Sequence, residues 1–117
     1  MTDGYSEADA AKRAAMGQVE DNANEIWLEY MLDRLWEIAL TRRSFTADDI
    51  YDRYQDMDGD KPTTHEPRAM GPVFLRAAKL GYCEKAFVPA VPSRRRSLHA
   101  SPRTVWTSLI YEPGAQI

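Results

Sequence analysis

Cysteine is almost absent from this chain of 117 residues, and so are long apolar runs. Cys83 stands alone and cannot form an internal disulfide, which excludes the small secreted folds that depend on disulfide bonds. No stretch approaches the ~18 consecutive apolar residues of a membrane helix. Residues 1–4 also lack the basic start of a signal peptide. We therefore expect a cytoplasmic protein without membrane contact.

Motifs for catalysis and for metal binding are missing as well. The chain is too short for a nucleotide-binding enzyme with a second substrate domain. His65, Cys83 and His99 are too scattered for a closed zinc site. A calcium loop counted from Asp56 would have Lys61 where glycine is required. We therefore expect no enzyme, no catalytic residue, no cofactor and no bound metal.

Acidic and basic residues are distributed unevenly along the chain. Residues 1–60 contain fifteen acidic and six basic residues, a net charge of −9, whereas residues 61–117 contain three acidic and nine basic residues, a net charge of +6. A basic half joined to an acidic half favours a protein with one face that meets a polyanion. The alternative interpretation is a chance placement of charges on solvated surfaces.

The N-terminal third predicts an arm followed by one strong helix. Residues 1–21 are rich in alanine and in charged residues, with little to bury, which predicts a frayed helix or a disordered arm. Asn24 is the expected N-cap of a helix over residues 25–41. The apolar residues expected on its main stripe are Ile26, Trp27, Tyr30, Met31, Leu35, Ile38 and Ala39. An acidic ridge consists of Glu25, Glu29, Asp33 and Glu37.

The same helix has a second apolar stripe, which is more than one small core requires. Its members are Leu28, Leu32, Trp36 and Leu40. We predict that Leu28, Leu32 and Trp36 form a dimer contact or a partner site. The alternative is that the N-terminal arm folds over them.

Two further helices and a hairpin are predicted in the rest of the chain. Thr46 begins a short second helix that closes with Tyr54. Residues 68–80 form a third helix, and Gly81 stands where a helix commonly ends. Residues 82–88 and 104–111 have the composition of strands that flank a long polar tip. The third helix is expected to bury Met70, Val73, Phe74, Ala77 and Leu80, and the hairpin Tyr82, Phe87, Trp106 and Leu109.

This element order is that of a winged helix-turn-helix domain. The specific similarity lies in the run from His65 to Glu84, in the basic segment from Pro92 to His99, and in Val105 with Trp106. Residues 25–111 resemble the small winged-helix DNA-binding proteins of phages and prophages. Two departures are the acidic loop at residues 56–60 and a turn between the second and third helices that is longer than usual. The resemblance implies an α+β, mostly helical fold with three helices, a β-hairpin wing and an N-terminal arm. The expected boundaries are 1–21 for the arm, 22–112 for the winged-helix domain and 113–117 for the tail.

Candidate nucleic-acid contacts gather in the tip of the hairpin and around the third helix. Arg94, Arg95 and Arg96 carry the strongest signal, because consecutive guanidinium groups bind phosphates or enter a narrow minor groove. A solvated loop is the alternative interpretation. Candidates at the start of the third helix are Thr63, Thr64, His65 and Arg68. The remaining candidates are Arg76, Lys79, His99 and Arg103.

Together these features predict a small phage-type transcription regulator or replication accessory protein that binds double-stranded DNA in the bacterial host cytoplasm. The third helix is expected in the major groove, where it reads sequence specifically or semi-specifically, and the arginine tip on the backbone or in the minor groove. The rival interpretation is a winged-helix protein-interaction module that docks on a host or phage protein through its acidic, apolar first helix.

Overall fold

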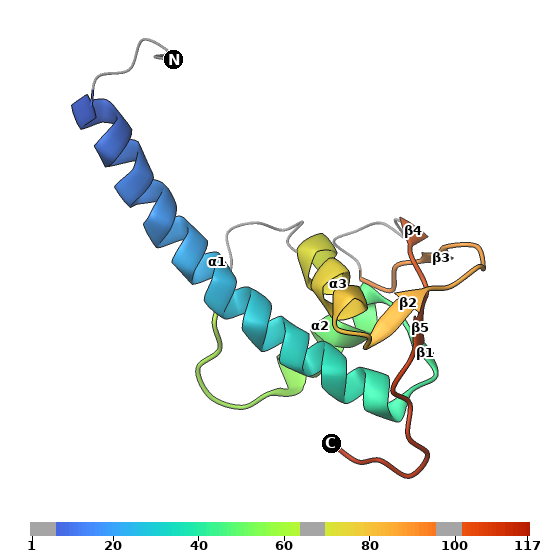
Figure 1. Cartoon of the computed structure of the whole chain (residues 1–117). Helices are drawn as coiled ribbons and strands as arrows, with labels where there is room; N and C mark the ends of the chain where they lie inside the picture. The colour runs from blue at the N-terminus through green and yellow to red at the C-terminus, as the bar shows by residue number, and fades with distance from the viewer. Residues whose placement is uncertain (1–6, 64–69, 96–101) are drawn as a thin grey trace.

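The structure is a computed structural model that describes residues 7–63, 70–95 and 102–117, with side chains from Asn24 onward (Figure 1). The described residues form three helices, α1 (Glu7–Thr41), α2 (Ala47–Asp56) and α3 (Met70–Lys79). They also form five short strands, β1 (Ser44–Phe45), β2 (Cys83–Lys85), β3 (Val91–Pro92), β4 (Pro102–Arg103) and β5 (Trp106–Ser108). The chain therefore has an α+β fold with antiparallel strands.

Helix α1 begins at Glu7, so the predicted start with an N-cap at Asn24 is wrong. The expected arm is helical from Glu7 onward. Alanine and the long charged residues have the highest helix propensities, and nothing between residues 7 and 24 stops a helix apart from the modest cost of Gly17. Helix α1 is therefore continuous across residue 24, where the pattern of apolar residues had predicted that the helix begins.

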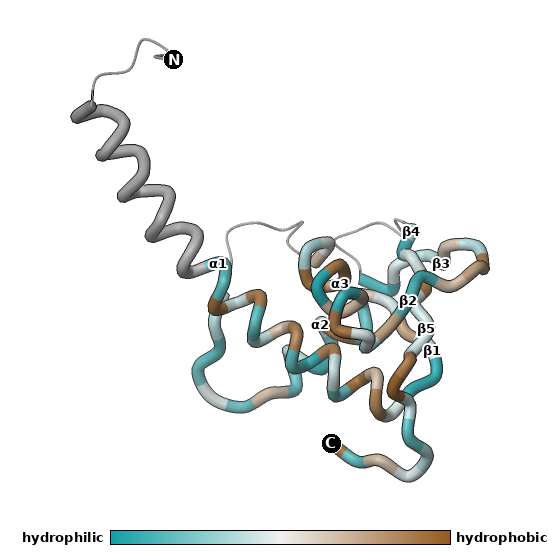
Figure 2. The backbone as a smooth tube through the Cα atoms, viewed as in Figure 1, coloured by the Kyte–Doolittle hydropathy of each residue, from teal (hydrophilic) through white to brown (hydrophobic). Residues whose placement is uncertain are grey.

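The core lies where α1 packs against α2 and α3 (Figure 1). Its buried apolar side chains are Trp27, Met31, Leu35, Ile38, Ala39, Phe45, Ala47, Ile50, Met70, Val73, Phe74, Ala77 and Cys83. The prediction for Ile26 is wrong, because this side chain is 60% exposed. At 100° per residue, Ile26 lies on the opposite side of α1 from Met31 and Leu35. Figure 2 shows the resulting alternation of hydrophobic and hydrophilic residues along α1 and α3.

Helix α2 starts as the sequence predicts. Thr46 is its N-cap: the hydroxyl accepts from the backbone N–H of Asp48, and the Asp49 carboxylate accepts from the N–H of Thr46 at 2.9 Å. This capping box satisfies amides that have no partner inside the helix. Two acidic residues in the first turn also interact favourably with the helix dipole.

Helix α3 ends at Lys79, and Gly81 follows it in the terminating position that the sequence predicts. Gly81 has a φ of +81°, and the N–H groups of Gly81 and Tyr82 donate to the carbonyls of Ala78 and Ala77. This pair of bonds is a Schellman motif, which glycine favours because the left-handed conformation costs it nothing. The prediction that Leu80 is buried is wrong: Leu80 lies in the turn that follows the last helical residue, Lys79, and is 53% exposed.

The strands form one sheet of order β1–β5–β2 and a separate antiparallel pair, β3–β4. Strand β5 lies in the centre, with Trp106 opposite Phe45 on one side and Lys85 on the other. Strand β1 was not predicted, and the predicted strands 82–88 and 104–111 are only three residues long each. The order of the elements and of the strands is consistent with a winged-helix-like layout.

The hairpin buries fewer side chains than its composition predicts. Trp106 and Tyr82 pack against the core but are only partly buried, less than expected. Phe87 and Leu109 are 106% and 50% exposed, so their assignment to the core is wrong. Both lie outside the strands of the three-stranded sheet. None of the helices in the described ranges combines the length and the apolarity needed to cross a bilayer.

Candidate nucleic-acid interface

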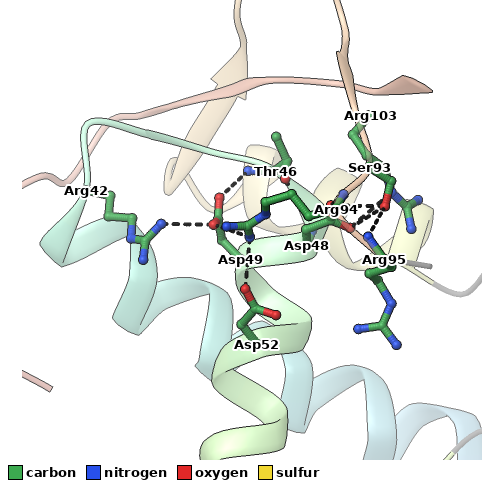
Figure 3. A network of polar contacts seen from close by, with 9 residues as sticks. All are labelled: Arg42, Thr46, Asp48, Asp49, Asp52, Ser93, Arg94, Arg95 and Arg103. Atoms are coloured by element: carbon green, nitrogen blue, oxygen red, sulfur yellow. Dashed lines mark hydrogen bonds and ion pairs between the residues drawn. The ribbon is translucent and has the colours of Figure 1, made fainter. Parts of the chain in front are cut away.

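Asp48, in the first turn of α2, anchors the tip of the hairpin from within the protein (Figure 3). Its carboxylate is almost fully buried and accepts from the Ser93 hydroxyl at 2.9 and 3.0 Å and from the backbone N–H of Arg94 at 2.6 Å. Nε of Arg103 lies 3.4 Å from the same carboxylate, which makes an ion pair rather than a hydrogen bond. Both sides of the β3–β4 extension are therefore fixed to α2.

Asp49 connects the tip to the C-terminal end of α1. One of its oxygens completes the capping box, and the other accepts from Arg42 Nη1 and from Arg94 Nη2, each at 2.9 Å. The carboxylate is only 11% exposed. Asp49 thus has a structural role that does not depend on the arginines.

The guanidinium groups of Arg94 and Arg95 lie against α2 and keep open sides. Arg94 Nη2 donates to Asp52 Oδ2 at 2.9 Å as well as to Asp49, and the Arg94 side chain is still 60% exposed. The Arg95 guanidinium lies 4.6 Å from the centre of the Tyr51 ring, an arrangement typical of cation–π pairs. Burial raises the pKa of Tyr51, and the positive charges of Arg95 and Arg103 partly oppose this rise.

Three of the predicted arginines, Arg94, Arg95 and Arg103, are therefore gathered at the N-terminal end of α2 (Figure 3). Arg96 and His99 lie outside the described residues. The sequence interpretation missed the partners of these arginines, namely Asp48, Asp49, Asp52 and Tyr51. The only signal for these partners in the sequence was the density of acidic residues in α2. In the structure, α2 contacts the basic segment that lies more than forty positions away in the sequence.

Among the described candidates around α3, Arg76 has its ion-pair partner on α1 and not on α2. Arg76 pairs with Glu25 of α1 at 2.6 Å, and this hydrogen bond holds the pKa of Glu25 below its ordinary value and that of Arg76 above it. Thr63 and Lys79 are exposed. Thr64, His65 and Arg68 lie outside the described residues. Leu75 is 63% exposed, so the visible solvent side of α3 is largely apolar.

A pocket of about 390 Å³ separates the start of α3 from the hairpin. Its walls are formed by Ala47, Met70, Gly71, Phe74, Leu75, Pro102, Arg103, Thr104 and Trp106. The walls are mainly apolar, and Arg103 supplies their one charged group. Within the described part of the chain, no three His, Cys, Asp or Glu side chains come together as a metal site would require.

The predicted partner stripe on α1 divides into two parts. Leu28 and Leu32 pack against the core and are half-buried, so these side chains stabilise the fold and leave less surface for a partner. Trp36 is 43% exposed and shares its side of the helix with exposed Ile26, Glu29 and Asp33. The remaining surface is smaller and more acidic than the predicted stripe.

Comparisons with protein-family models, with curated proteins and with solved structures find no match.

Proposed function

We propose that this chain is a small winged-helix protein that binds double-stranded DNA and has no catalytic activity. The start of α3 would lie in the major groove, and the arginine cluster at α2 would meet the phosphate backbone or the minor groove. The observation that carries the proposal is the gathering of Arg94, Arg95 and Arg103 on the N-terminal half of α2. The resemblance to phage and prophage proteins favours a regulator or a replication accessory protein.

The layout of the helices supports this docking. In helix-turn-helix proteins the helix before the recognition helix crosses the DNA backbone. Here that helix is α2, and its N-terminal end carries the arginine cluster. Guanidinium groups bind phosphates through paired hydrogen bonds, and those of Arg94 and Arg95 are accessible from solvent. The local excess of positive charge arises because Arg42, Arg94, Arg95 and Arg103 surround only three aspartates.

The backbone contact is tested with R94A/R95A/R96A and mixed-sequence duplex DNA over a range of salt concentrations. We expect weaker binding to all sequences and a log-log salt slope that is smaller by ~0.9 for each phosphate that the variant no longer neutralises. K12A/R13A removes two charges from the start of α1 and serves as the control. Equal affinity and slope in the wild type and the triple variant would rule out Arg94, Arg95 and Arg96 as DNA contacts.

Base reading is tested separately with His65→Ala and Arg68→Ala. If either side chain reaches a base edge, the variant should lose ~1–3 kcal/mol of discrimination between sequences. Its salt slope should change less than that of the triple variant. If both variants keep full discrimination between sequences, His65 and Arg68 do not read the bases.

One observation favours a second candidate, a protein-docking module. Trp36 and Ile26 are exposed on α1 on either side of Glu29 and Asp33. Large apolar side chains that remain exposed commonly belong to interaction sites. The acidic residues between them favour a basic, amphipathic partner segment or a host protein with such a segment. This surface lies on a different helix from the arginine cluster, so both activities can exist in one chain.

A further inference from the structure

We propose that, in the free protein, Asp52 and Asp49 bind the Arg94 guanidinium at the position that a nucleic-acid phosphate would take. DNA then competes with Asp52 for the Nη2 group of Arg94. This inference rests on the proposed DNA binding and describes how its backbone contact is controlled. Asp52 would thereby reduce affinity for every sequence and make the contact depend on a close approach of the backbone.

The backbone at Arg94 is held in place, so the position of its Cα and the reach of its side chain are fixed. The buried Asp48 carboxylate accepts from the N–H of Arg94 and from Ser93, whose side chain is also buried. The guanidinium is consequently held close to Asp49 and Asp52 at a high effective concentration. An external phosphate competes with carboxylates that are already in position.

The geometry at Arg94 is one that a phosphate can replace. Nη2 donates to Asp49 Oδ1 and to Asp52 Oδ2, each at 2.9 Å, so two carboxylate oxygens accept from the same nitrogen (Figure 3). A phosphate group offers oxygens of the same kind for charge-assisted hydrogen bonds. The 60% exposure of the Arg94 side chain gives an incoming backbone access without breaking the Asp48 anchor.

The two aspartates differ in how readily they can be released. Asp49 is 11% exposed and also binds Thr46 and Arg42, so it stays in place. Asp52 is 56% exposed, and its one described contact is with Arg94. An exposed ion pair of this kind is weak and sensitive to salt. Asp52 is therefore the group that DNA would displace.

The test compares Asp52→Asn with wild type by fluorescence anisotropy, using the full chain and a mixed-sequence duplex at low salt. Removal of the competing carboxylate should tighten binding by about two- to fivefold, because an exposed ion pair sets an upper limit of about fivefold. Asp56→Asn is the matched control, because Asp56 is an exposed acidic residue four positions further along α2. It reproduces the change in net charge without touching Arg94, and we expect less than a ~twofold effect.

The same pair of variants in an Arg94→Ala background separates local competition from a general field effect. There, D52N should affect binding no more than D56N does. If D52N and D56N act equally in the wild-type background while R94A still weakens binding, the competition is overturned and DNA binding stands. If the wild-type chain binds no duplex DNA, the proposed function fails and this inference fails with it.

Discussion

The ring of Phe74 in α3 stacks on the indole of Trp106 in β5, with 4.8 Å between the ring centres and 14° between the planes. Phe45 stacks against the same Phe74 ring at 6.2 Å. The Phe74–Trp106 stack joins α3 to the central strand of the sheet. Together the two ring contacts connect β1, α3 and β5, which are separated along the chain.

Replacing Phe74 by alanine should lower the free energy of unfolding by ~3–5 kcal/mol, because the change removes a buried ring and leaves a cavity. Phe74 is 5% exposed. Urea unfolding followed by circular dichroism measures the loss. Phe87→Ala is the control, since Phe87 is fully exposed and its removal should change stability by less than ~0.5 kcal/mol. Similar losses in the two variants would mean that the stack does not hold the hairpin on the helices.

Asp48→Ala should destabilise the chain by ~3 kcal/mol, since it leaves the partly buried Arg103 without its carboxylate. Ser93→Ala deletes one hydrogen bond to the same carboxylate and should cost ~1 kcal/mol. Urea unfolding of both variants measures the order of the two effects. Asp56→Ala, at an exposed position of the same helix, provides the baseline. A loss for D48A no larger than for D56A would show that the anchor contributes nothing to stability.

Cys83 should be almost inert in the folded chain. Burial raises the pKa of its thiol from an ordinary value of 9.0 to about 11, so little reactive thiolate is present near pH 8. Reaction with a thiol reagent at that pH should be slow, and it should become fast when guanidinium unfolds the chain. Equal rates in the two conditions would contradict the burial of this side chain.

The raised pKa of Cys83 also predicts a loss of stability in alkali. The folded pKa lies above the unfolded one, so the unfolded chain releases the proton first as pH rises. The contribution of the thiol is complete below pH 9.0 and is lost as pH rises towards about 11. Unfolding of wild type and Cys83→Ala between these pH values measures the difference. It should narrow as pH increases, and a constant difference would contradict the linkage.

If α1 mediates self-association, Trp36→Glu should yield a folded monomer from a wild-type dimer. Trp36 is 43% exposed, so a charged side chain can be accommodated there without disturbing the core. Sedimentation at high protein concentration measures the change. Leu75→Glu places the same charge on another exposed apolar position, in α3, and should leave the assembly unchanged. A wild-type chain that sediments as a monomer would leave this surface to a different partner.

Local features of the sequence determined the second and third helices. Thr46 and Asp49 form a capping box whose bonds span three residues, and Gly81 ends α3 through bonds to the carbonyls of Ala77 and Ala78. Such contacts depend on residue types at fixed short spacings, and the sequence displays these directly. The apolar spacing of α3 likewise predicted the burial of its core side, since helical geometry converts spacing into a face.

Only the tertiary structure decided how the hairpin and its arginines are used. Strands of two or three residues carry no readable period. Strand β1 becomes a strand through β5, far along the chain, and β3 and β4 do so through each other. Phe87 has the composition of a core residue, but it lies outside the strands of the three-stranded sheet and is exposed. The sequence displayed both the arginines and the aspartates, but the contact of Arg94 with Asp49, 45 positions apart, exists because packing brings the hairpin extension onto α2. Charge attraction acts at short range in water, and the folded chain supplies that proximity.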